Sequence, residues 1–265
     1  MTFLFRTLVA LATAYIAIIV ILWVLQSRFL YPAPQTAAPL TPGFAEVTLQ
    51  TSDGLDLRAI YREAEEGLPT IVYFHGNGGS ISGASVSNAA LVEAGMGALL
   101  VEYRGYGGNP GSPSEDGFYR DGEAAMGWLA RQGIDPSETV IIGNSIGGGV
   151  ATEMALRHDP AALILVAPFT SLPDAVQSNL WWVPARMLVR DQYRNAAKIG
   201  ELNLPILIQH GDADTLIADS HGKTLSTLAK DGTFQPFARS GHALSFERRS
   251  QEARRDWLLS LGARR

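Results

Sequence analysis

The chain has 265 residues, of which 46% are apolar and 18% charged. This composition supports a sizeable buried core and excludes a disordered chain. With 26 acidic and 21 basic residues the net charge is −5, which argues against a nucleic-acid binder of the basic kind. There is no cysteine, so a disulfide scaffold, a thiol nucleophile and a thiolate metal site are excluded.

The N-terminal region contains an uncharged run from Thr7 to Leu25. As a helix this run would be about 28 Å long, close to the ~30 Å hydrocarbon core of a bilayer. Arg6 and Arg28 bracket it, and Trp23 stands where an interfacial aromatic would anchor it. A cleaved signal peptide has a shorter apolar core of about 7–15 residues, and a buried core helix usually shows a polar face. The sequence therefore predicts a transmembrane anchor over residues 1–28.

Four prolines lie between residues 31 and 43. That density predicts an extended tether over residues 29–43, followed by a globular domain over residues 44–265. The short basic leader that contains Arg6 favours an N-terminus in the cytoplasm, which would place the domain outside it.

The globular part alternates short apolar runs with helical patterns. Two runs, 45–51 and 55–62, flank Ser52-Asp53-Gly54 and predict a hairpin. Further strands are expected at 70–74, 98–101, 139–142, 162–166, 205–209 and 233–238. Helices are expected at 81–94, 117–131, 147–158 and 245–259. This alternation predicts one α/β domain with a mostly parallel sheet, whose ligands bind beyond the carboxyl ends of the strands.

The loop after the 139–142 strand reads Gly143-Asn144-Ser145-Ile146-Gly147, a G-x-S-x-G match. With 18 serines and about one glycine in ten, chance alone gives about 0.2 matches. The context is more specific, because an apolar strand ends here and a helix begins at Gly147, as a nucleophile elbow requires. We therefore predict that Ser145 is a nucleophile. The alternative is a glycine-rich turn with an idle serine.

A serine nucleophile needs a base, and the base needs a partner that orients it. Only one of the five histidines, His242, lies in a loop between a late strand and the final helix, so it is the predicted base. His75 and His210 each precede a glycine directly after a strand, which is more typical of a loop-shaping histidine. Asp214 follows the 205–209 strand and is the predicted acid. Two nearby carboxylates are rivals for that role: Asp212 and Asp219.

The chain order Ser145, Asp214, His242 is that of the α/β-hydrolase triad. Such a site also needs donors for the oxyanion, and the amide of Ile146 directly after the serine would supply one. The second is expected from the glycine-rich loop after the 70–74 strand, where the Asn77 amide is preferred and Gly78 is the alternative.

The sequence resembles the α/β-hydrolase superfamily, and within it the bud-emergence-protein-like branch of membrane-associated serine hydrolases. The matching segments are FLYPAP (29–34), HGNGG (75–79), EYRGYGGNPGSPSE (102–115), GNSIGGG (143–149), APFTSL (167–172), PILIQHGDAD (205–214) and SGH (240–242). They span most of residues 29–250. Relatives often have Asp where this chain has Glu102, a departure with no evident catalytic consequence.

The resemblance implies an α/β-hydrolase fold, with a mostly parallel eight-stranded sheet, helices on both faces and a membrane anchor. It also implies a serine hydrolase that acts on small-molecule esters or thioesters, some of them lipid-derived. In the expected mechanism His242 accepts the Ser145 proton and water cleaves the acyl-enzyme, so no metal or organic cofactor is expected. Two other functions remain open: an oligopeptidase-type serine peptidase, or a non-catalytic anchored scaffold.

Substrate choice is expected to depend on a short cap over residues 169–202. Its apolar run, residues 180–189, carries three candidate substrate-binding side chains: Trp181, Trp182 and Met187. The alternative is a helix that merely packs on the domain.

Overall fold

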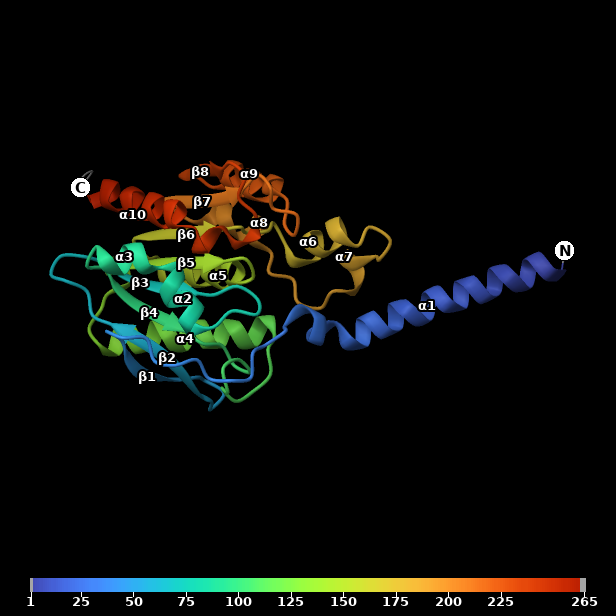
Figure 1. Ribbon diagram of the computed structural model, residues 1–265, viewed down its shortest axis with the longest axis horizontal. Coiled ribbons are helices and arrows are strands. Elements are labelled where there is room, and N and C mark those ends of the chain that lie inside the picture. The colour runs from blue at the N-terminus through green and yellow to red at the C-terminus, as the bar shows by residue number, and fades with distance from the viewer. Residues whose placement is uncertain (1, 263–265) are drawn as a thin grey trace.

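The computed structural model of the protein describes residues 2–262. Residue 1 and residues 263–265, at the ends of the predicted anchor and domain ranges, lie outside the described residues. One twisted sheet forms the centre of the domain, with helices on both faces (Figure 1). Helix α1 (Thr2–Leu30) extends away from this domain as a long rod.

The sheet has eight strands in the order β1-β2-β4-β3-β5-β6-β7-β8. Strand β1 pairs antiparallel with β2, and β2 pairs antiparallel with β4, while the other neighbours are parallel. The predicted hairpin and the mostly parallel eight-stranded sheet are thus confirmed. The strands are β1 (Ala45–Gln50), β2 (Asp56–Arg62), β3 (Thr70–Phe74), β4 (Gly97–Val101), β5 (Thr139–Asn144), β6 (Ala162–Val166), β7 (Ile206–Gly211) and β8 (Gly232–Phe237).

The helices that follow α1 are α2 (Ile81–Ser87), α3 (Ala89–Glu93), α4 (Glu115–Arg131), α5 (Gly147–His158), α6 (Leu172–Asn179), α7 (Ala185–Leu188), α8 (Asn195–Lys198), α9 (Asp219–Leu228) and α10 (Arg248–Gly262). Short 3₁₀ turns lie at Pro136–Glu138, Ile199–Glu201 and His242–Phe246. The helix predicted over 81–94 is broken at Asn88, whose side-chain amide donates to the Ala84 carbonyl at 2.8 Å. The last predicted helix starts as the His242–Phe246 turn and continues as α10.

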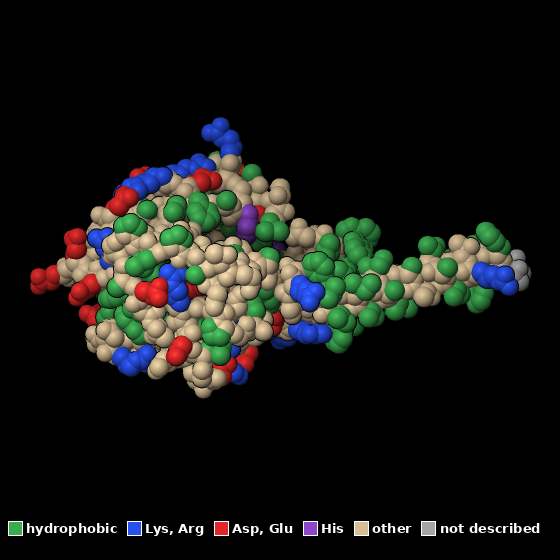
Figure 2. All heavy atoms as spheres, turned by 60° about the horizontal axis from the view of Figure 1, so that its bottom comes forward, with side chains coloured by type: hydrophobic (Ala, Val, Ile, Leu, Met, Phe, Trp, Pro, Cys, Tyr) green, Lys and Arg blue, Asp and Glu red, His purple; other side chains and the backbone are tan. Residues whose placement is uncertain are grey.

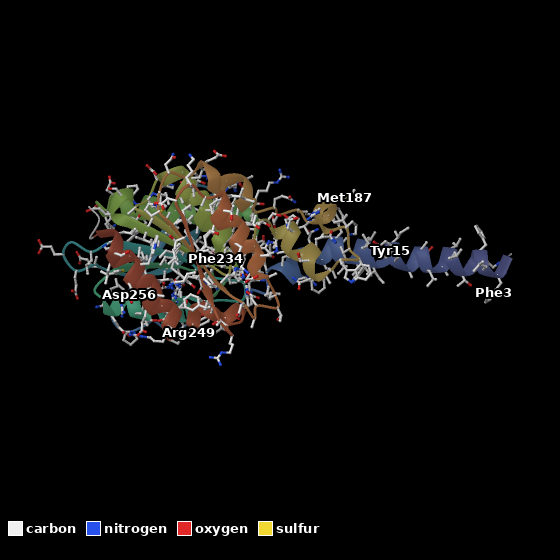
Figure 3. The ribbon with its side chains drawn as sticks, turned by 90° about the horizontal axis from the view of Figure 1, so that it is seen from above. Phe3, Tyr15, Met187, Phe234, Arg249 and Asp256 are labelled. Carbon is white, nitrogen blue, oxygen red and sulfur yellow. The ribbon has the colours of Figure 1, made fainter. Side chains whose placement is uncertain are left out.

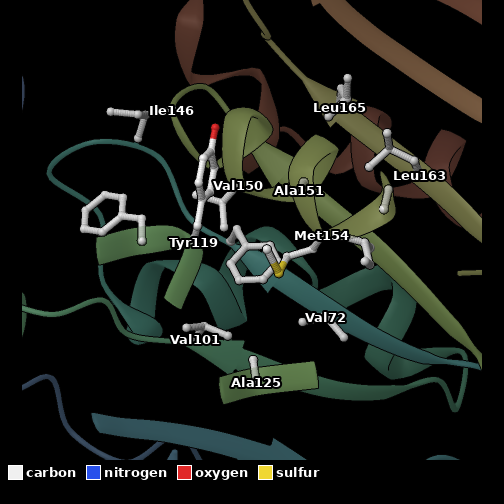
Figure 4. Close-up of a cluster of buried hydrophobic side chains, with 14 of the residues drawn as sticks. Val72, Val101, Tyr119, Ala125, Ile146, Val150, Ala151, Met154, Leu163 and Leu165 are labelled. Atoms are coloured by element: carbon white, nitrogen blue, oxygen red, sulfur yellow. The ribbon is translucent and has the colours of Figure 1, made fainter. Parts of the chain in front are cut away.

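The core has one layer on each face of the sheet, because side chains of a buried strand alternate between the faces. On β3, Val72 and Phe74 pack in the layer beneath α4 and α5. Ile71 and Tyr73 pack in the opposite layer, with apolar side chains of α2, α3 and α10. Figure 4 shows the first layer, where Val150 and Met154 of α5 lie among strand side chains. Two packed faces hold the strand ends, and therefore the loops that follow them, in fixed positions.

The segment from Tyr31 to Gly43 has irregular backbone but lies against the domain. The buried Tyr31 hydroxyl donates to Asp191 Oδ2 at 2.7 Å. The Gly107 amide donates to the Pro34 carbonyl at 2.7 Å, and Arg58 Nη1 donates to the Ala38 carbonyl at 2.9 Å. These contacts fix the point from which α1 leaves the domain.

Candidate active site

Ser145 lies at the turn between β5 and α5, at the carboxyl edge of the sheet. Its φ is +52°, in the left-handed region that a non-glycine residue rarely adopts. The backbone segments at this turn pack so closely that they require glycine. A methyl group on Gly147 would overlap the Phe74 carbonyl oxygen, and one on Gly143 would overlap the Gly147 carbonyl oxygen. The Ser145 amide donates to the Val166 carbonyl at 2.9 Å, which ties the strained residue to β6.

Three side chains that are far apart in the sequence meet at this turn. Ser145 Oγ lies 3.0 Å from His242 Nε2, and His242 Nδ1 lies 2.8 Å from Asp214 Oδ2. Both distances are hydrogen-bond distances, and the imidazole lies between the hydroxyl and the carboxylate. The structure therefore brings together the predicted nucleophile, base and acid in the geometry that nucleophilic catalysis needs.

The Asp214 carboxylate is held from both sides. Its Oδ1 accepts hydrogen bonds from the amides of Leu216 and Ile217, each at 2.9 Å. Nε2 of the buried His210 lies 3.4 Å from Asp214 Oδ2. The same nitrogen lies 2.9 Å from the carbonyl oxygen of Ile217. Burial alone would raise the Asp214 pKa, but contacts with His210, His242 and the Ile217 amide outweigh it and hold that pKa well below its usual value. The carboxylate is thus an anion at neutral pH.

The rival carboxylates have other partners. Asp212 Oδ1 accepts the Arg239 amide at 2.6 Å, and Asp219 pairs with Lys223 at 2.7 Å. Both therefore act as loop or helix carboxylates. Asp214 is the one carboxylate within residues 2–262 that forms a hydrogen bond with His242.

The backbone amides of Ile146 and Asn77 have no acceptor among the described residues. Ile146 precedes the first turn of α5, where helix amides have no intrahelical partner. Asn77 lies in the loop after β3, and its side-chain Oδ1 accepts the Tyr106 hydroxyl at 2.8 Å. Both residues line the same cavity as Ser145. They are therefore available as donors to an oxygen atom bound there.

The loop that carries Asn77 is supported by His75, in the loop-shaping role predicted for it, and by Glu102, a partner that the sequence analysis did not identify. His75 Nε2 lies 3.1 Å from Glu102 Oε1, and the Ile81 amide donates to Glu102 Oε2 at 3.1 Å. Glu102 is fully buried and His75 nearly so. Because β3 and β4 are neighbours, the residues that follow them are adjacent at the sheet edge. The sequence feature that could have indicated this pair is an acidic residue directly after β4 together with a histidine directly after β3.

A cavity of about 720 Å³ opens beside Ser145 and His242, within the usual range for a small-molecule site. Its walls are mainly apolar and come from α6, α7, the loops around them and the last turns of α1. The three predicted cap residues do not line it: Trp181 and Met187 are 82% and 85% exposed, and Trp182 is also surface-exposed. Their neighbours Leu180 and Leu188 face the cavity instead.

Comparison with known proteins places this arrangement in a family. Residues 69–198 match the family model described as the alpha/beta hydrolase fold. An uncharacterized protein of Mycobacterium tuberculosis is 34% identical over 222 residues, which cover 81% of this chain and 79% of the relative. The chain belongs to the α/β-hydrolase superfamily.

Two further comparisons agree with this assignment. The lysophosphatidylserine lipase ABHD12 of Danio rerio is 31% identical over 198 residues, 67% of this chain and 50% of the relative. The crystal structure of an alpha-beta hydrolase from Vibrio vulnificus superposes with a TM-score of 0.75 at 24% identity, covering 89% of this chain and 92% of the other. The fold and these relatives indicate a hydrolase.

Proposed function

We propose that the protein is a serine hydrolase that cleaves carboxylic esters or thioesters through an acyl-enzyme on Ser145. The observation that carries the proposal is the line of contacts from Ser145 Oγ through the His242 ring to Asp214, at 3.0 and 2.8 Å. The motifs of the sequence also favour the bud-emergence-protein-like branch of the superfamily. Cleavage of a lipid-derived ester is the substrate class that the Danio rerio relative supports.

The chemistry follows from these positions. As the Ser145 oxygen bonds to the acyl carbon, its proton moves to His242 Nε2, and the carbonyl electrons move onto the oxygen to form an oxyanion. The carbon–oxygen or carbon–sulfur bond to the leaving group then breaks, and His242 returns the proton to that group. Water, deprotonated by His242, attacks the acyl-enzyme next. The bond to Ser145 breaks and the serine recovers its proton.

The anionic Asp214 holds the imidazole with Nε2 toward Ser145 and stabilises the imidazolium. The Ile146 and Asn77 amides are the proposed donors to the oxyanion. A single such donor typically lowers the barrier by about 2.7–4 kcal/mol. Fixed backbone donors suit this role because they need no reorganisation when the charge develops.

We assign α1 as a membrane anchor, with the catalytic domain on the extracytoplasmic side. The segment Phe3–Leu30 is long and apolar enough to cross a bilayer, a property that it shares with signal sequences. Retention of the helix is supported by its contacts with the domain, where the largely buried Gln26 side chain donates to the Leu188 carbonyl at 3.3 Å and accepts the Arg190 amide at 2.9 Å. Cleavage near residue 28 would remove these contacts.

A fluorophosphonate probe tests the chemistry. The wild-type protein in detergent should be labelled, Ser145→Ala should not be labelled, and His242→Ala should be labelled far more slowly. A panel of p-nitrophenyl esters, acyl thioesters and lysophospholipids then defines the substrate. Labelling that persists in Ser145→Ala would overturn the proposal. Peptide cleavage without ester turnover would indicate a peptidase, and inactivity toward both the probe and the panel would indicate a scaffold.

A further inference from the structure

We propose that the last turns of α1 form one wall of the substrate cavity, so that the acyl group of a membrane lipid reaches Ser145 laterally from the bilayer, between α1 and the cap. The cap is defined here as residues 169–202. This inference rests on the proposed serine hydrolase function and on α1 crossing a bilayer. It adds a second role for the helix, in which the anchor also binds substrate.

The first observation is a stripe of cavity-lining residues on α1. Five side chains of the helix line the same cavity as Ser145 and His242. They occupy positions i, i+1, i+4, i+7 and i+8, the spacing of a single helix face. They are Leu22, Trp23, Gln26, Phe29 and Leu30. The wall is therefore a continuous face of the helix over its last turns.

The second observation is that specific contacts hold this face against the cap. The carbonyl of Leu188 and the amide of Arg190 both bond to the Gln26 side chain, at 3.3 and 2.9 Å. The Arg190 guanidinium lies over the Trp23 ring, 4.3 Å from its centroid. Because Gln26 is a polar residue with its hydrogen bonds satisfied inside an apolar face, it fixes the rotation of α1 about its own axis.

The third observation is that the cap continues alongside the apolar part of α1. The Tyr15 hydroxyl, halfway along the helix, donates to the Trp182 carbonyl at 3.0 Å. Trp181 and Met187, on the same part of the cap, expose most of their apolar surface. Figure 2 shows hydrophobic side chains gathered where the domain meets the helix, and Figure 3 shows Met187 at the outer end of the cap, away from the sheet. A bilayer that α1 crosses therefore also meets this surface of the cap.

The cavity communicates with that surface. Trp23, Phe29 and Leu180 line the cavity, yet each is exposed on the outer face of the protein as well. The cavity walls that α1 and the cap contribute are apolar apart from Gln26, which is bonded to the cap, and Asn179, whereas Ser145 and His242 line the same cavity from the edge of the sheet. An acyl chain can thus lie along the seam between α1 and the cap in contact with lipid while its carbonyl reaches the serine.

Full-length protein in phosphatidylcholine vesicles provides the test. Leu22→Trp adds bulk to the cavity wall, and Ile21→Trp is the matched control, because Ile21 neighbours Leu22 but is exposed and does not line the cavity. We expect Leu22→Trp to lower kcat/KM for p-nitrophenyl dodecanoate at least tenfold relative to p-nitrophenyl acetate, with Ile21→Trp within twofold of wild type. A second variant, Leu22→Ala, should shift the preferred acyl length upward without weakening the helix.

Fluorophosphonate labelling of Ser145 in each variant separates the possible failures. Normal labelling with an unchanged ratio of dodecanoate to acetate turnover in Leu22→Trp and Leu22→Ala would overturn the lateral route and leave the hydrolase intact. Equal effects of Ile21→Trp and Leu22→Trp, together with a dimer in detergent, would show that a second copy covers this face, which also overturns the proposal. A wild-type protein without Ser145-dependent labelling would refute the proposed function itself.

Discussion

The site at the edge of the sheet and the wall formed by α1 and the cap meet at one cavity but are built differently. Ser145, Asp214 and His242 follow packed strands and are joined by hydrogen bonds of 2.8–3.0 Å. The opposite wall is mainly apolar, and parts of it are exposed. The groups proposed to react therefore depend on the rigid fold, whereas the groups proposed to contact the acyl chain depend on how a separate helix packs against a short cap. Substitutions in each region separate these two contributions.

The largest effect is expected at the sheet edge. Ser145→Ala removes the proposed nucleophile and should lower kcat about 10⁶-fold, the scale seen when a triad serine is removed. Binding of a long-chain ester should change little, because the apolar wall is intact. Steady-state ester hydrolysis and equilibrium binding of a non-hydrolysable analogue measure the two quantities. A kcat within tenfold of wild type would contradict the proposed chemistry.

Asp214→Asn is the next largest change. It keeps the shape of the side chain but removes the charge that orients the His242 ring, and kcat should fall about 10⁴-fold. The matched control is Asp212→Asn, whose carboxylate accepts the Arg239 amide and does not contact His242. Similar losses of kcat in both variants would show that a disturbed loop conformation, and not a misoriented imidazole, explains the loss.

Glu102 is expected to be a positioning residue. Glu102→Ala leaves the Ile81 amide and the His75 ring without their buried partner, which loosens the loop that carries Asn77. A displacement of the proposed oxyanion donor should lower kcat about 10²-fold with little change in KM. Glu102→Asp should recover most of the lost rate. A purely structural role would instead lower the thermal midpoint of the Glu102→Ala variant while kcat of its folded fraction stayed normal.

The pH dependence tests the state of Asp214. Its pKa is held well below the usual value, so the carboxylate stays ionised above about pH 4 and takes up no proton as activity is lost there. The acid limb of log kcat/KM should therefore have a slope of one, a tenfold loss per pH unit. The stabilising effect of the ionised carboxylate is present above about pH 4 and is lost at lower pH. An acid limb with a slope of two would show that Asp214 is protonated as well.

The smallest effect is expected on the outer surface of the cap. Trp181→Ser removes an exposed apolar side chain that would meet lipid, and it should reduce turnover of a vesicle-bound ester about threefold. Turnover of a soluble acetate ester should be unchanged. Leu228→Ser, which is also exposed but lies on α9 in another part of the domain, is the control. Equal losses in both variants would show that the cap has no special contact with the bilayer.

The sheet and the positions of the three site side chains could be predicted because their signals are local. Buried strands read as short apolar runs, and a strained serine between a strand and a helix is indicated by Gly143 and Gly147. Asp214 is predicted as the acid from its place after the 205–209 strand, and its hydrogen bond with His242 then distinguishes it from Asp212. The chain order Ser145, Asp214, His242 also favours the α/β-hydrolase fold, because the same three residue types occur in other orders in the chymotrypsin and subtilisin folds.

The rest depended on packing between distant segments. The pairing of His75 with Glu102 requires knowing that β3 and β4 are neighbours. Nothing local in the sequence distinguishes Gln26, because its partners Leu188 and Arg190 lie more than 160 positions away. For the same reason the cap residues that line the cavity could not be told apart from those that face outward, such as Trp181.

Trapping the acyl-enzyme tests the central claim most directly. Wild-type protein mixed with a p-nitrophenyl ester, quenched in acid during the first turnover and digested, should yield a Ser145-containing peptide heavier by one acyl group. A burst of p-nitrophenol equal to the enzyme concentration should accompany it. The Ser145→Ala protein should give neither. A burst without an acyl group on Ser145, or an acyl group on another residue that supports turnover, would contradict the mechanism.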